Sequence, residues 1–264
     1  MNSDKTAWSD YDFAVTGSDQ VWCEAAVAPE VKLSFYYLEF IEREKRIAYA
    51  PSFGFTEFNP ELYEVHKKGL LGFNRLSCRE KRGCELIKEA TGIEAEHVLD
   101  PTLLLNSEQW RKCSRKPECN LPEHYALSYM LGVVPPEQKQ LIKQFAGNLP
   151  VFDVFDEKCI PCNIAGPAEF IYLVDHADFV LTNSFHGTAL ALNFKKNFLV
   201  FDRRYAPFNR MESLLSRLNI FERIYKPGML FNLGEINYDE VYSILSAWRE
   251  SSMKYLRECL KISE

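Results

Sequence analysis

The chain has 264 residues, of which 47% are hydrophobic and 26% are charged, and its formal net charge is −6. These values predict a globular protein with one large domain or two of ordinary size, and they exclude a globally disordered chain. An acidic chain also lacks the basic footprint that general nucleic-acid binding and adhesion to anionic membranes require.

No apolar run in the sequence reaches the length of a transmembrane helix, and residues 1–10 are polar, without the apolar centre of a secretory signal. We therefore expect a cytoplasmic protein. Its eight cysteines are expected to be free thiols, because disulfides are rare in reducing compartments.

The first half of the chain alternates short apolar runs with amphipathic stretches. Apolar runs closed by glycine or proline predict buried strands, and longer runs with helical periodicity predict helices. We expect strands at residues 11–17, at 46–54 with a Pro/Gly-marked loop, at 75–79 and at 97–101, and helices at 60–72 and 80–91. The polar, charged stretch 108–120 then predicts a domain boundary.

The second half repeats this alternation, with expected strands at 125–132, 151–155, 178–182 and 197–202 and expected helices at 135–146, 167–176, 185–194, 210–218 and 238–260. Apolar strands that alternate with helices predict parallel sheets covered on both faces. We expect an α/β protein with two Rossmann-like domains, residues 1–112 and 121–264.

Polar and ionisable residues gather directly after the predicted strands. In doubly wound sheets a ligand binds outside the carboxyl ends of the strands, so these residues predict a cleft for an anionic substrate. They are Ser18, Asp19, Arg79, Asp100, the segment 183–188, Asn209 and Arg210.

In the segment 183–188 a strand leads directly into a helix, with Ser184 as the expected N-cap and Gly187 and Thr188 in the helix. The first-turn N–H groups and the helix dipole stabilise a phosphate or carboxylate. His186 in that turn is suited to proton transfer. The same pattern also fits a capped helix whose histidine only packs, and spacing does not separate these interpretations.

Three charged residues have both a functional and a structural interpretation. Arg79 is suited to a two-pronged bond with a carboxylate or phosphate, or to an ion pair with Glu80, Glu85 or another nearby acidic group. Asp19 fits a turn cap as well as catalysis, and Asp100 fits a turn carboxylate. A second basic group consists of Arg203, Arg204 and Arg210.

Several motifs argue against other functions. Cys159 and Cys162 form a lone CxxC, which predicts two loop cysteines rather than a zinc or redox site. The sequence contains no Walker A motif, no GxGxxG and no GxSxG, which disfavours an NTPase, a dinucleotide enzyme and a hydrolase. We expect no metal and no cofactor.

Five segments in chain order resemble motifs of the polysaccharide pyruvyl transferase family. They are YDFAVTGSDQVW at residues 11–22, SCREK at 77–81, VLDPTLLL at 98–105, ADFVLTNSFHG at 177–187, and Asn209-Arg210 followed by Leu214 and Leu215. Together they span nearly the whole chain.

This resemblance implies a GT-B-like fold with a cleft between two domains and a last helix, 238–260, that crosses back to the first domain. Relatives begin with a strand and a Gly- or Asn-rich loop that precede the GSDQ segment. We therefore expect the first domain to be N-terminally incomplete.

The resemblance also implies transfer of pyruvate from phosphoenolpyruvate to a sugar as a cyclic ketal. His186 matches a catalytic position, and Arg79 matches a clamp for phosphoenolpyruvate. Ser184 stands where some relatives carry an arginine. The further expected catalytic residues are Asp19 and Asp100, and the further substrate contacts are Ser18, Ser184, Gly187, Thr188, Asn209 and Arg210.

The implied partners are phosphoenolpyruvate and a saccharide acceptor, and a lipid-linked acceptor would bring the protein to a membrane surface. Two alternatives stay open at this point: a GT-B glycosyltransferase that uses a nucleotide sugar, and a non-catalytic remnant that serves as a binding module.

Overall fold

The structure is a computed structural model, and it describes residues 8, 10–25, 32–156, 158–159, 166–202 and 209–262. The chain divides into two compact units. Unit 1 comprises Met1–Leu104, Tyr205–Leu214 and Ile244–Glu264, and unit 2 comprises Leu105–Arg204 and Leu215–Ser243. The boundaries 1–112 and 121–264 and the GT-B arrangement stay predictions.

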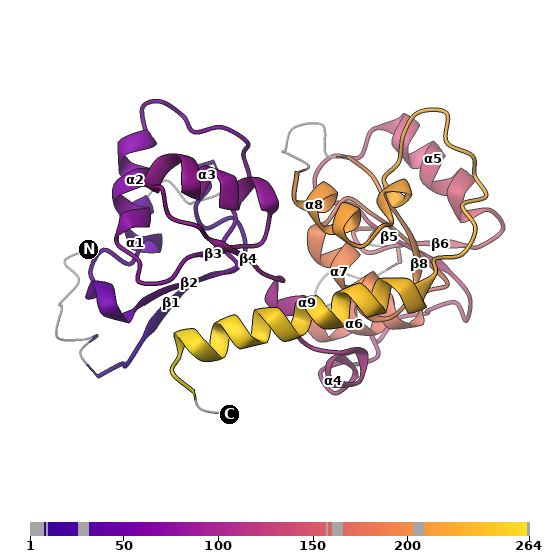
Figure 1. Cartoon of the computed structure of the whole chain (residues 1–264). Coiled ribbons are helices and arrows are strands. Elements are labelled where there is room, and N and C mark those ends of the chain that lie inside the picture. The colour runs from indigo at the N-terminus through magenta and orange to yellow at the C-terminus, as the bar shows by residue number, and fades with distance from the viewer. Residues whose placement is uncertain are drawn as a thin grey trace. The chain divides into compact units, whose positions relative to one another are not determined.

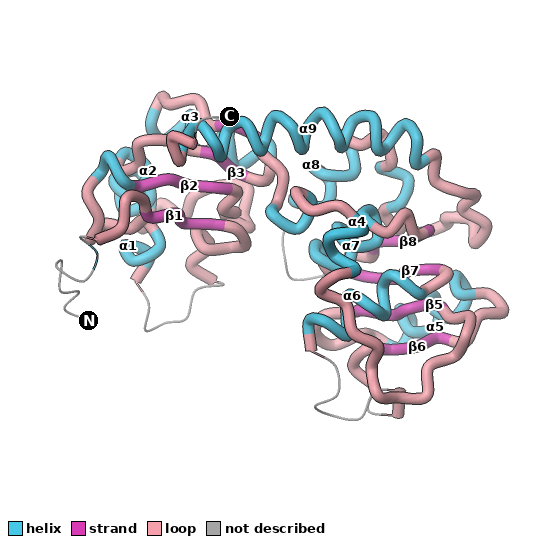
Figure 2. Tube along the Cα trace, turned by 90° about the horizontal axis from the view of Figure 1, so that it is seen from below, coloured by secondary structure: helices cyan, strands magenta, loops and turns pink. Residues whose placement is uncertain are grey.

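The described residues of unit 1 form four short parallel strands: β1 (Ala14–Gly17), β2 (Arg46–Tyr49), β3 (Ser77–Cys78) and β4 (Glu96–His97). β1 pairs with β2, with Ala14 opposite Arg46, and β3 pairs with β4, with Ser77 opposite Glu96. An isolated parallel bridge between Ile47 and Arg75 joins the two pairs. In Figure 2, β1, β2 and β3 lie side by side.

Aromatic side chains fill the main core of unit 1, beneath the helices α1 (Leu33–Tyr36), α2 (Tyr63–Leu71) and α3 (Lys81–Thr91). Trp22 is fully buried, and its ring centroid lies 5.4 Å from that of Tyr37 and 5.0 Å from that of Phe53. α3 ends at Gly92, whose φ of +74° is the left-handed conformation that glycine adopts at low cost.

A second core cluster of unit 1 forms around β2 and the end of α9 (Tyr238–Cys259). It contains Ile47, Tyr49, Tyr255 and Cys259. The contact division falls inside α9, so its residues up to Ser243 belong to unit 2 and those from Ile244 belong to unit 1.

Unit 2 contains a four-stranded parallel sheet with the order β6-β5-β7-β8 (Figure 2). The strands are β5 (Ala126–Tyr129), β6 (Val151–Asp153), β7 (Phe179–Thr182) and β8 (Asn197–Val200). The chain runs from β5 outward to β6 and then continues with β7 on the other side of β5. The point between β5 and β7 is therefore a topological switch point, where doubly wound sheets bind their ligands.

The remaining helices are α4 (Ser107–Arg111), α5 (Pro136–Ala146), α6 (Pro167–His176), α7 (Phe185–Asn193) and α8 (Asn209–Arg217), and short 3-10 turns cover Arg43–Lys45, Pro101–Leu103 and Phe221–Arg223. Figure 1 labels α5, α6 and α7 around the strands of unit 2. The predicted mixed α/β class with parallel sheets is confirmed. Among the described helices, none combines the length and apolar character needed to cross a membrane.

The structure differs from the sequence prediction mainly at element ends. β1 begins at Ala14 rather than at residue 11, because Tyr11 and Asp12 are exposed and lie outside the ladder with β2. α4 overlaps the start of the polar stretch 108–120, for which the sequence predicted a domain boundary and no helix. A capping box between Asn106 and Gln109 starts this short helix.

Candidate functional site

The carboxyl ends of β5 and β7 are tied together by two polar side chains of unit 2. The Asn183 side chain accepts a hydrogen bond from the Leu131 N–H at 2.7 Å and donates one to the Leu131 carbonyl at 3.1 Å. The Thr182 hydroxyl donates to the Tyr129 carbonyl at 2.7 Å. These bonds fix the loop after β7 at the switch point of the sheet, where the first turn of α7 begins.

Three of the predicted site residues build that first turn. The Ser184 hydroxyl caps α7 by accepting from the Gly187 N–H at 3.4 Å, and the Thr188 hydroxyl donates to the Ser184 carbonyl at 2.9 Å. A Cβ on Gly187 would lie 2.7 Å from Thr182 Oγ1 and 3.1 Å from Tyr129 Cδ1. Gly187 therefore allows α7 to approach the strands closely.

His186 is the exception within the segment 183–188, since its five neighbours there are buried and its own side chain is partly exposed. Its ring packs edge-on against Phe185 with centroids 5.7 Å apart. An imidazole held on a rigid first turn can move a proton, and the amino end of a helix favours an anion nearby. The first turn that carries His186 is held in place by the buried residues Ser184, Gly187 and Thr188.

A second cluster of predicted site residues lies in unit 1, and we name it the Arg79 cluster: Ser18, Asp19, Arg79, Asp100 and Arg210. The Arg79 guanidinium donates to Asp100 Oδ2 at 2.8 Å and to Asp19 Oδ1 at 2.9 Å. Arg210 Nη1 lies 3.8 Å from the same Asp19 oxygen. Burial lowers the pKa of Arg79, but the charges of Asp100 and its neighbours outweigh that effect and raise it.

Asp19 is the member of this cluster that faces solvent, with 62% of its side chain exposed. It is a non-glycine residue with φ +65°, a conformation that aspartate tolerates better than most residues. Its carbonyl accepts from the Ser52 N–H at 2.8 Å. The backbone and two arginines thus hold an exposed carboxylate in one place after β1.

Asp100, by contrast, is enclosed, with 1% of its side chain exposed. Besides Arg79, it accepts hydrogen bonds from the Ser18 hydroxyl and from both the N–H and the hydroxyl of Thr102, the latter two at 2.9 and 2.7 Å. A carboxylate with so many donors is suited to holding Arg79 rather than to transferring protons. Its catalytic role stays a prediction.

Glu80, which the sequence offers only as an ion-pair partner of Arg79, is fully buried next to the Arg79 cluster. Its Oε1 accepts from the Ser52 hydroxyl at 3.0 Å and from the Phe53 N–H at 2.9 Å. Burial raises the pKa of its carboxyl, and the Arg79 charge opposes that rise. Glu85, the other expected partner of Arg79, lies 3.3 Å from Arg82 instead.

Several predicted residues fall outside what the structure describes. Asn209 is the first residue of α8, but its side chain lies outside the described set, as do Arg203, Arg204 and Cys162. Cys159 is a free, partly buried thiol. Within the described residues, no group of three or more His, Cys, Asp or Glu side chains is placed to hold a metal ion.

Comparison with known proteins identifies the family of this chain. A model of the polysaccharide pyruvyl transferase family matches residues 2–205, a range that includes Asp19, Arg79, Asp100 and His186 and ends before Arg210. No curated protein matches the chain. Because the match covers well over half of the chain, the protein belongs to the polysaccharide pyruvyl transferase family, and that membership implies a transferase.

Proposed function

We propose that this protein transfers the pyruvyl group of phosphoenolpyruvate to a saccharide diol, forming a cyclic ketal and releasing inorganic phosphate. Membership of the polysaccharide pyruvyl transferase family supports the reaction class. The observation that carries the proposal is the placement of His186, a partly exposed imidazole on a buried first turn at the switch point of unit 2.

The chemistry forms two C–O bonds at C2 of the donor, the first by addition and the second by displacement of phosphate. A proton adds to the methylene carbon, and the first sugar hydroxyl attacks C2 and loses its proton to a base. The second hydroxyl then displaces phosphate from C2, and its proton leaves with the phosphate. His186 is suited to deliver the first proton, and the amino end of α7 stabilises the donor's negative charge.

Arg79 has a different role in this proposal from the clamp that the family resemblance implies. Its guanidinium is fully buried and already bonded to Asp19 and Asp100. We therefore propose that Arg79 positions the exposed Asp19 carboxylate. Asp19 is a candidate to accept the proton of an attacking hydroxyl.

The test of this function measures phosphate release and ketal formation from phosphoenolpyruvate with saccharide acceptors, together with thermal unfolding in the presence of the donor alone. A ligand that binds only the folded state raises the melting temperature. We expect phosphoenolpyruvate to raise it and UDP-sugars to leave it unchanged. His186→Gln should lower turnover by about 10²–10⁴-fold, the usual contribution of a general acid or base.

The matched control is His124→Gln, which removes an exposed histidine of the same unit and should retain full turnover. Stabilisation by a UDP-sugar in place of phosphoenolpyruvate would favour the nucleotide-sugar glycosyltransferase. A cooperatively folded protein that responds to neither ligand would favour a non-catalytic binding module. Full turnover of His186→Gln would remove His186 from the mechanism.

A further inference from the structure

Unit 2 contains a cavity of about 830 Å³ after the carboxyl ends of β5 and β6. Its size is within the range of sites for small organic ligands. Gly132 follows β5, Asp153 ends β6, and Lys139 and Lys143 enter the lining from α5. Phe155, Asp156, Lys158 and Cys159 also lie in the wall.

The two lysines indicate the charge of the ligand. Lys139 and Lys143 are four residues apart, so they lie on the same face of α5, where like charges destabilise a helix by about 0.2–0.5 kcal/mol. Both side chains are exposed, and among the described residues no ion pair or side-chain hydrogen bond is found for either ammonium group. Lys158 also lines the cavity, so three lysines face the two carboxylates of Asp153 and Asp156, and this excess of positive charge favours an anionic ligand such as a phosphate ester.

Phe155 lines the cavity with an aromatic ring that is supported by stacking on another ring. Its side chain is 58% exposed, and its ring stacks on Tyr129 with centroids 5.4 Å apart and planes at 19°. Tyr129 in turn contacts Phe170, with centroids 4.3 Å apart. A fixed aromatic face suits the apolar face of a sugar ring.

Asp153 adds a fixed hydrogen-bond acceptor beside this ring. Its Oδ2 accepts from the Ser128 hydroxyl at 3.1 Å, and its Oδ1 accepts from the Phe155 N–H at 2.9 Å. Carboxylates retain further acceptor capacity after two such bonds, which suits the hydroxyl groups of a saccharide.

The cavity adjoins the first turn of α7 through Tyr129. Tyr129 supports Phe155 on one side, and its Cδ1 lies 3.1 Å from the position that a Cβ on Gly187 would take. Gly187 directly follows His186. A ligand stacked on Phe155 would therefore lie on the same sheet edge as the proposed catalytic histidine, within the same unit.

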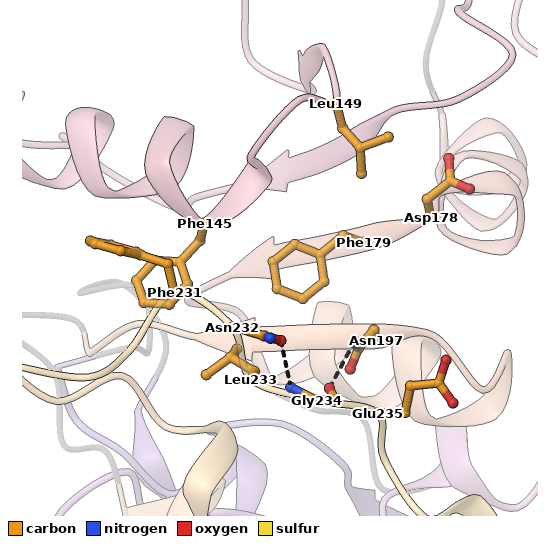
Figure 3. Close-up of a pocket in the computed structure, with 10 residues that line it drawn as sticks. All are labelled: Phe145, Leu149, Asp178, Phe179, Asn197, Phe231, Asn232, Leu233, Gly234 and Glu235. Carbon is orange, nitrogen blue, oxygen red and sulfur yellow. Dashed lines mark hydrogen bonds between the residues drawn. The ribbon is translucent and has the colours of Figure 1, made fainter.

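The cavity at the opposite sheet edge has different chemistry. Figure 3 shows it at the amino ends of β7 and β8, with the rings of Phe145, Phe179 and Phe231 in its wall. Its Asn197 amide is engaged by the Gly234 carbonyl at 3.2 Å and by Arg223 at 2.9 Å. This cavity of about 340 Å³ offers no lysine or arginine among its lining residues, so it does not fit an anionic ligand.

We propose that the cavity of Lys139, Lys143 and Phe155 binds a saccharide that carries a phosphate or diphosphate. The lysines hold the phosphoryl group, Phe155 packs against the sugar ring, and Asp153 accepts from ring hydroxyls. That this saccharide is the pyruvyl acceptor rests on the function proposed above. The binding itself does not depend on that function.

Isothermal calorimetry on the full chain tests the binding without phosphoenolpyruvate. The probes are a hexose 1-phosphate, inorganic phosphate, a neutral disaccharide and UDP. We expect the hexose 1-phosphate to bind more tightly than either inorganic phosphate or the disaccharide. The double variant Lys139→Gln/Lys143→Gln and the single variant Phe155→Ala should each weaken that binding at least about tenfold.

The matched control is Lys112→Gln/Lys116→Gln, which removes the same charge at the same spacing from exposed positions of unit 2 outside the cavity. It should retain the affinity of the unchanged protein. The proposal is overturned if the hexose 1-phosphate does not bind, if both lysine double variants bind it equally, or if UDP binds in its place with the same lysine dependence.

A thermal-shift titration with phosphoenolpyruvate separates this proposal from the preceding one. Lysine-dependent binding of the hexose 1-phosphate without any response to phosphoenolpyruvate would leave the cavity assigned and contradict the pyruvyl transfer. A response to phosphoenolpyruvate that survives in Lys139→Gln/Lys143→Gln, with no binding of the sugar phosphate, would support the donor site and contradict the cavity.

Discussion

At the residue scale, Arg79 joins two carboxylates from distant parts of the sequence, and its own side chain has no exposed surface. Removing one partner of a buried ion pair leaves an uncompensated charge, which costs about 3–5 kcal/mol. Arg79→Ala should therefore lower the free energy of unfolding of unit 1 by about that amount, because Asp100 stays buried without its cation. Urea denaturation measures this change.

The control for Arg79→Ala is Arg82→Ala on the neighbouring helix turn. Arg82 is 30% exposed and pairs with Glu89, and exposed pairs contribute about 0–1 kcal/mol. If Arg79→Ala kept the stability of the unchanged protein and lost only donor binding, then Arg79 would be the clamp that the family resemblance implies rather than a positioning residue.

We expect His66 to make the stability of unit 1 depend on pH. Its ring is buried among Phe53, Phe55 and Phe58, and its Nδ1 lies 2.6 Å from the Tyr37 hydroxyl. Burial lowers its pKa below the usual 6.5, and the charge of nearby Glu24 opposes this only in part. Between the lowered pKa of the folded chain and the usual value of 6.5, the unfolded chain binds the proton more readily than the folded chain does.

The stabilisation that comes from neutral His66 is therefore complete above the unfolded pKa and is lost as the pH falls through it. We expect the free energy of unfolding to fall as the pH drops through the usual histidine pKa of about 6.5, and the fall to be smaller in His66→Gln. The same substitution at exposed His124 serves as the control. An equal pH dependence in His66→Gln would show that other groups cause the loss.

At the element scale, α7 can approach β5 and β7 closely because Gly187 has no Cβ. A Cβ there would lie 2.7 Å from Thr182 Oγ1, an atom held in place by its own hydrogen bonds. Gly187→Ala should destabilise unit 2 by about 1–3 kcal/mol, the usual cost of overpacking, and should lower turnover by displacing His186.

Gly166→Ala is the matched control, because among the described residues a Cβ at the start of α6 would approach only the Glu169 carboxylate, at 3.2 Å. Stability is measured by chemical denaturation and turnover by ketal formation. An alanine at 187 that leaves both unchanged would mean that the first turn of α7 can shift without affecting the site.

Single elements show which parts of the structure the sequence predicted and which it did not. The helix predicted at 167–176 matches α6, because proline marks its start and the apolar period is clear. α1 was not predicted, since a four-residue helix with only Leu33 buried leaves no periodic pattern. The sequence showed that Asp19, Arg79 and Asp100 follow strands, but their pairing is a tertiary contact that no local pattern contains.

At the scale of the whole molecule, α9 contributes side chains to both units. Its early residues support unit 2, where the Tyr242 hydroxyl donates to the Asn193 carbonyl at 2.6 Å. Its later residues support unit 1, where Trp248 Nε1 donates to the His97 carbonyl at 2.9 Å and the Tyr255 hydroxyl donates to the Ala48 carbonyl at 3.1 Å. Substitutions along one helix should therefore act on different units.

Trp248→Ala removes a side chain that is 3% exposed, a change that costs about 3–5 kcal/mol in a core. Tyr242→Phe removes one hydrogen bond, worth about 1 kcal/mol. Amide hydrogen exchange should then speed up in β2 and β4 for Trp248→Ala and in α7 and β8 for Tyr242→Phe, each without effect on the other unit. Faster exchange throughout the chain in either variant would mean that the two units unfold as one cooperative body.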